Sequence, residues 1–208
     1  LLADFLFEEV FLQLDDNQRK VLLGLSVVES FNATLSDVIN EVTNSEILIQ
    51  TLLADGLFIV KLNHESNGYR LHALFRDWLF DHGQNTEKNY LVKCQRRAIG
   101  WLNEHECFDD ALNLAFSLQD WPLVASIMRK LYPSILQMGR LDYAANIIKK
   151  IPVHVMATMP HLNMLRAVMC FNLYQYQETQ LYLEKVVVCI DQFYSSQSDQ
   201  QQTLLIGM

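Results

Sequence analysis

The chain has 208 residues, half of them hydrophobic, which is enough to bury one large core or two smaller ones. Only 7 residues are Gly and 4 are Pro, which favours a mostly α-helical protein. Apolar runs such as Val21–Val28 are far too short to span a membrane, and residues 1–14 lack the basic start of a signal peptide. Four cysteines without CxxC spacing are typical of reduced thiols. We therefore predict a cytoplasmic protein without membrane contact.

The net charge of −8 is unevenly distributed along the chain. Residues 1–85 hold 13 acids and 5 Lys or Arg, whereas residues 86–208 hold 11 of each. The polar run HGQNTEKN interrupts the apolar pattern at this boundary. We predict a winged-helix-like module at 1–85 and helical repeats at 86–208. Neither end is capped, which indicates an internal fragment whose repeats are truncated at the C-terminus.

The first module opens with one predicted helix, and three further predicted helices follow it. Leu1–Leu12 has helical spacing, and Asp15 with Gln18 forms a capping box before the next helix. Thr34 with Asp37 is a second capping candidate, opening a helix over Leu35–Val42. Asn44 opens the third helix, and Gly56 occupies its C′ position. The apolar stripe of this third helix is predicted to contain Ile47, Leu48, Leu52 and Leu53.

A β-hairpin and a further helix follow. Leu57–Asn63 is predicted to be a strand, Asn63–Gly68 a turn and Tyr69–Leu71 the returning strand, before a helix from about His72 to Gly83. Helices followed by such a hairpin describe a winged helix. Many winged helices bind DNA, but Val21–Val60 contains five acids and no Lys, Arg or His. Since DNA binding needs basic residues against phosphates, we predict a protein-contact module without direct DNA binding.

His72 is the candidate binding residue. It lies where a helix begins, and unsatisfied N–H groups with a partial positive charge can hold an anion there. The alternative is a half-buried histidine that fixes the corner between hairpin and helix.

The second part contains a repeat. Glu87–Glu104 is a predicted helix, and three similar stretches follow that begin at Phe108, Leu141 and Tyr176. Aligning Ala111, Ala144 and Thr179 gives steps of 33 and 35 residues, close to the period of about 34 of tetratricopeptide-like helix pairs. Trp121–Gln137 and His161–Tyr174 are predicted first helices. Leu141–Lys150 and Gln177–Ile190 are predicted second helices, the last with a stripe of Leu183, Val186, Val187 and Ile190. An irregular link is predicted between Pro152 and Pro160, and an ordinary helical domain with chance spacing is the alternative.

No pattern for catalysis or metal binding is present. The chain lacks a Gly-rich phosphate loop, an HExxH motif and cysteines or histidines at zinc spacing. We predict that it is not an enzyme and that it holds no metal. A stand-alone helical-repeat adaptor, an enzyme domain with an unfamiliar site and a DNA-binding winged helix are the competing interpretations.

Two segments together carry a family resemblance. YRLHALFRDWL at 69–79 and RRAIGWLNEHECFDDALNLAFSLQDW at 96–121 make the chain similar to the MalT-like ATP-dependent LuxR-type transcriptional activators. The resemblance implies a mainly all-α fragment holding the winged helix and the start of the tetratricopeptide-like sensor region. The first segment also resembles the MHD motif of related switch ATPases, whose histidine contacts the β-phosphate of ADP. Leu71 matches the first motif position and His72 the histidine, whereas Ala73 replaces the usual acid.

The resemblance implies a switch. No cofactor is expected in this fragment, but ATP or ADP would bind an ATPase domain of the full-length protein and contact His72. The implied partners are that ATPase domain, a DNA-binding domain and an unknown inducer at the repeats, with self-association on activation.

Overall fold

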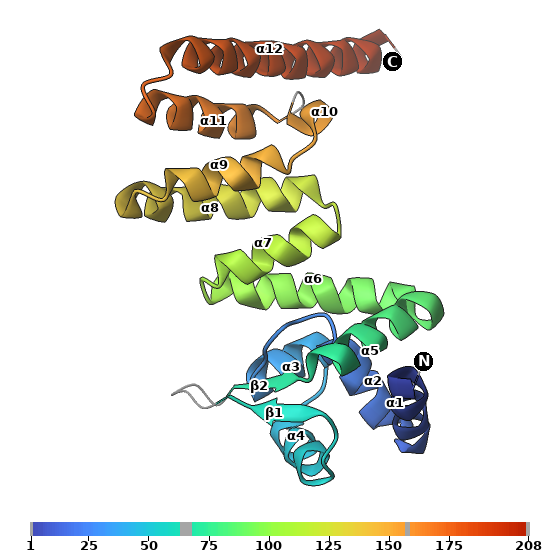
Figure 1. Ribbon diagram of the computed structural model, residues 1–208. Coiled ribbons are helices and arrows are strands. Elements are labelled where there is room, and N and C mark those ends of the chain that lie inside the picture. Colours follow the sequence, from blue (N-terminus) through green and yellow to red (C-terminus); the bar gives the residue numbers. More distant parts are fainter. Residues whose placement is uncertain (1, 63–67, 157–158, 207–208) are drawn as a thin grey trace. The chain divides into compact units, whose positions relative to one another are not determined.

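A computed structural model describes residues 2–62, 68–156 and 159–206, which form two compact units, Leu1–Gln119 and Asp120–Met208. Among these residues no helix combines the length and apolarity needed to cross a bilayer. The mainly α-helical fold that we predicted is confirmed (Figure 1). The compact units divide after Gln119. The domain boundary at residues 85 and 86 stays a prediction.

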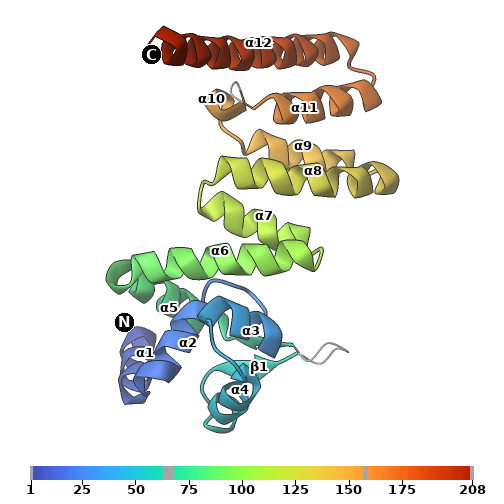
Figure 2. The same cartoon turned by 180° about the vertical axis from the view of Figure 1, so that it is seen from behind.

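The first unit is a winged helix followed by two further helices. Its strands pair antiparallel, with Ile59 opposite Leu71 and Lys61 opposite Tyr69, and Phe31 adds an isolated bridge to Tyr69. The hairpin lies beside the fourth helix in both views (Figures 1 and 2). The elements are α1 (Leu2–Gln13), α2 (Asp16–Leu25), α3 (Ala33–Asn40), α4 (Ser45–Ala54), β1 (Ile59–Lys61), β2 (Tyr69–Leu71), α5 (Ala73–Thr86), α6 (Lys88–Glu104) and α7 (Phe108–Ser117).

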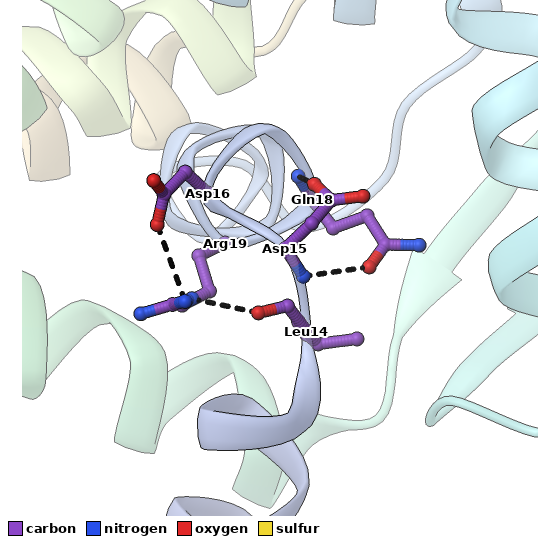
Figure 3. A network of polar contacts seen from close by, with 5 residues as sticks. All are labelled: Leu14, Asp15, Asp16, Gln18 and Arg19. Carbon is purple, nitrogen blue, oxygen red and sulfur yellow. Dashed lines mark hydrogen bonds and ion pairs between the residues drawn. The ribbon is translucent and has the colours of Figure 1, made fainter.

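The capping box at the start of α2 is confirmed (Figure 3). Asp15 Oδ1 accepts from the Gln18 N–H at 2.8 Å, and Gln18 Oε1 accepts from the Asp15 N–H at 3.0 Å. Arg19 closes the same turn, since its Nε donates to the Leu14 carbonyl at 2.9 Å and its guanidinium pairs with Asp16 at 3.2 Å. These contacts satisfy N–H groups that a helix start leaves unpaired.

The predicted cap of α3 is wrong. Asn32, not Thr34, is the N-cap, because Asn32 Oδ1 accepts from the Leu35 N–H at 2.8 Å. Thr34 only donates its hydroxyl to Asn32 Oδ1. Asp37 instead accepts from the Ser45 N–H at 2.8 Å and so caps the next helix. The helix consequently spans 33–40 rather than 35–42.

The α4 region is partly as predicted. Asn44 precedes α4 and Gly56 follows it with a φ of 71°. Of the predicted stripe, Leu52 is buried and Leu48 and Leu53 are half-buried, whereas Ile47 is 70% exposed. Ile49, which was not predicted, is buried because α3 and β1 cover the face that it shares with Leu52. The first strand is three residues long, shorter than predicted. The predicted turn at 63–68 lies outside the described residues except for Gly68.

Helix pairs account for the rest of both units. Helix α6 packs against α7, and the buried residues of this pair include Leu91, Cys94, Ala98 and Leu102 of α6 and Ala111 of α7. In the second unit α8 pairs with α9, and α11 contacts α8, α9 and α12. Its elements are α8 (Trp121–Met138), α9 (Leu141–Lys149), α10 (Val153–Met156), α11 (Pro160–Asn172) and α12 (Tyr176–Ile206).

The three repeat stretches all open helices. Phe108, Leu141 and Tyr176 are the first residues of α7, α9 and α12, which agrees with the predicted helix pairs. Two details of the prediction are wrong. The link after Pro152 contains the short helix α10, and the predicted stripe of α12 is right only at Val186, which is buried together with Cys189. Leu183, Val187 and Ile190 are exposed, because α11 covers only one side of α12.

Candidate functional site

His72 lies between β2 and α5, as the sequence predicted. Its N–H donates to the Phe58 carbonyl at 2.6 Å, and its carbonyl accepts from the Arg76 N–H at 2.9 Å. The side chain is exposed and makes no capping hydrogen bond. Backbone bonds therefore fix the corner, and the imidazole stays available for another group.

A residue with a strained backbone lies next to this corner. Phe58 has a φ of 41°, in the left-handed region that bulky residues rarely adopt. Its ring packs on Phe7 and Phe75, with centroids 5.2 and 4.9 Å away. Since Phe75 is fully buried in α5, this aromatic cluster holds the strained residue and the start of α5 together.

Tyr69 fixes the wing to the helices, a role that the sequence did not reveal. It is 1% exposed, and its main chain exchanges hydrogen bonds with Phe31 at 2.7 and 2.9 Å. Its hydroxyl donates to Glu46 Oε1 at 3.0 Å and accepts from Gln50 Nε2 at 2.8 Å. Burial, followed by the bond to Glu46 and its charge, raises the pKa of Tyr69. In the sequence, the only indication of this role was that a tyrosine lies in a short predicted strand.

A cavity of about 380 Å³ surrounds His72. Its titratable lining residues are Arg70, His72 and Arg76, with Glu29 opposite them. Arg76 lies 4.0 Å from Glu29 and 3.0 Å from Asp77, so its charge is partly balanced. The start of α5 adds its partial positive charge at the same place. We call this surface the His72 corner; it can bind an anion electrostatically. The other lining residues are Ser30, Val60, Leu62, Leu71 and Ala73.

The helices that could reach DNA carry no positive charge. Residues 33–54, covering α3 and α4, contain Asp37, Glu41 and Glu46 and no Lys, Arg or His. Within the part of the chain that the structure describes, no three His, Cys, Asp or Glu residues converge to hold a metal ion. None of the four cysteines forms a disulfide among the described residues, and of the four only Cys107 is exposed.

A winged helix with an acidic face, followed by paired helices, defines a module of the winged-helix and helical-repeat class. Residues 7–91 match the family described as the MalT winged helix domain. The chain is MalT-like, and residues 7–91 are its winged-helix domain.

Similar proteins cover most of the chain. The HTH-type transcriptional regulator MalT of Vibrio parahaemolyticus is 30% identical over 185 residues, which is 88% of this chain and 20% of that protein. MalT of Vibrio cholerae is 31% identical over 185 residues, again 88% of this chain and 20% of that protein. The serine/threonine-protein kinase PknK of Mycobacterium tuberculosis is 21% identical over 164 residues, 79% of this chain and 15% of that protein. The chain spans about a fifth of the length of the MalT relatives it matches.

Proposed function

We propose that this chain is the coupling part of a transcriptional regulator, in which the His72 corner reports the nucleotide state of an ATPase domain to the helical repeats. The supporting comparison is with relatives named as transcriptional regulators. A protein kinase is similar over much of the same region. A region that a transcriptional regulator and a kinase share fits a regulatory role better than the particular activity of either protein.

The His72 corner supplies the chemistry for this role. An exposed imidazole at a helix start, with one arginine from β2 and one from α5, suits the phosphates of ADP. The residues that would hold the phosphate are His72, Arg70 and Arg76. A bound ADP would supply only the negative charge of its phosphates at this corner. An inducer bound by the repeats would shift the population toward an ATP-bound, self-associating form.

DNA contact is assigned to another domain of the longer protein. The acidic α3 and α4 would repel a duplex, because phosphate neutralisation by Lys or Arg provides most of the affinity of such modules. The winged helix of this chain therefore serves protein contact.

The experiment uses the full-length protein loaded with a fluorescent ADP analogue. We expect His72→Ala to release the nucleotide faster and to raise basal reporter transcription, since the exposed ring contributes little to folding. His105→Ala is the matched control, because His105 is also an exposed histidine at a helix end but stacks on Trp101 at 3.7 Å. An unchanged off-rate for His72→Ala, or an equal change in both variants, would reject the proposal.

A further inference from the structure

The first unit contains a second, larger cavity of about 500 Å³. It is formed by the segment after α2 and by α5, α6 and α7, and its floor is apolar: Val27, Val28 and Leu102 are buried, and Phe80 and Leu114 are half-buried. This volume lies within the range of about 300–1,000 Å³ of small-molecule sites. We call it the acid-rimmed cavity.

Its rim carries more negative than positive charge. Glu29, Asp77, Asp81 and Asp110 line it, and the single cation there is Arg76. Arg76 pairs with Asp77 at 3.0 Å and lies 4.0 Å from Glu29. Among the described residues no cation pairs with Asp81 or Asp110. Burial, then the charges of Glu29 and Asp109, raise the pKa of Asp110.

A buried amide is directed to the same cavity. Gln95 lines it although it is only 3% exposed, and its Nε2 donates to Ser117 Oγ at 3.2 Å. Its carbonyl oxygen has no hydrogen-bond partner among the described residues. It is not one of the fully buried unpaired atoms of the described residues, so it remains accessible and can accept a hydrogen bond from a donor in the cavity.

We propose that the acid-rimmed cavity binds a small organic cation, with its ammonium or guanidinium group against Asp110 and Asp81 and its aliphatic body on the apolar floor. A donor on the cation can also reach the Gln95 carbonyl. A metal ion fits less well, because the rim acids do not converge into a three-ligand group within the described residues. The inference does not depend on the proposed role of His72.

Agmatine is a suitable probe, because it has a four-carbon body with a cation at each end. We expect isothermal titration of the 208-residue chain at low salt to show saturable 1:1 binding, with no binding of 1-butanol or butyrate. Asp110→Asn should weaken agmatine binding about tenfold, since it removes a charge-assisted hydrogen bond. Asp81→Asn, on another helix, should also weaken it if the rim acts as a unit.

Asp109→Asn is the matched control, since Asp109 precedes Asp110 in α7 but does not line the cavity. Its affinity should stay within about threefold of the parent, because charges outside the site act through screened solvent. Absence of saturable agmatine binding, or equal losses in Asp109→Asn and Asp110→Asn, would overturn the proposal. So would tighter binding of a capped lysine with none of free agmatine, which would assign the cavity to a side chain of another polypeptide.

Discussion

The stability lost on removing a tyrosine hydroxyl should depend on whether that hydroxyl is hydrogen-bonded in the folded protein. Tyr90 of α6 donates to Asn40 Oδ1 at 2.9 Å, and the Lys20 carbonyl also lies 3.2 Å from the hydroxyl. Asn40 is 7% exposed, and its Nδ2 donates to the Ser36 carbonyl. Tyr90→Phe leaves Asn40 Oδ1 without its donor inside the first unit. An unsatisfied buried acceptor costs about 1–3 kcal/mol, so we expect a loss of about 2 kcal/mol in the free energy of unfolding.

Tyr132→Phe is the opposite case, in the second unit. The Tyr132 hydroxyl is buried without a partner among the described residues, so its removal should be neutral or stabilising. Urea unfolding followed by far-UV circular dichroism and tryptophan fluorescence gives the free energy of unfolding of each variant, and the slope m should not change. A loss below about 0.5 kcal/mol for Tyr90→Phe, or equal losses in both variants, would refute the reasoning.

Two further predictions concern glycine and charge. Gly24→Ala should destabilise by about 1–3 kcal/mol, because an added Cβ would overlap Asn40 Oδ1, whereas Gly100→Ala, where nothing lies within 4 Å, should stabilise by about 0.5–1 kcal/mol; urea unfolding measures both. Asp110 has a raised pKa in the folded state, so its contribution to stability is present at low pH and is lost as pH rises through that pKa. Asp110→Asn should therefore be more stable than the parent at pH 7, and the gap should close below about pH 4; thermal unfolding across this range that shows no such gap would contradict the assignment.

Local patterns could be predicted from the sequence, whereas choices between neighbouring patterns could not. The Asp15 and Gln18 capping box needs only residues of one turn, and it formed as predicted. Thr34 and Asp37 have a similar spacing, yet Asn32 caps α3 because Asp37 is taken by the Ser45 N–H eight residues later. That competition depends on how α3 and α4 meet in space.

The same limit applies to burial and to the candidate site. The pattern of α4 contained several apolar faces, and packing on α3 and β1 selected the one with Ile49. His72 could be placed from the boundary between a strand and a helix. The hydrogen bond between Tyr69 and Glu46 joins residues 23 positions apart in the sequence, and the ion pair between Arg76 and Glu29 joins residues that are still further apart. No periodicity in the sequence predicts contacts between residues so far apart in the chain, so the two cavities could be found only from the structure.

Helix α6 belongs structurally to both predicted domains. Only Glu87 separates α5, which begins beside His72, from α6. Arg97, midway along α6, donates to the Ile39 carbonyl at 2.9 Å and pairs with Glu41 at 2.5 Å. Helix α6 has 17 residues and is about 25 Å long. It packs against the winged helix and also contacts α7. We expect a tilt of the hairpin corner to rotate α6 and the helix pair that it forms with α7, because only Glu87 lies between α5 and α6.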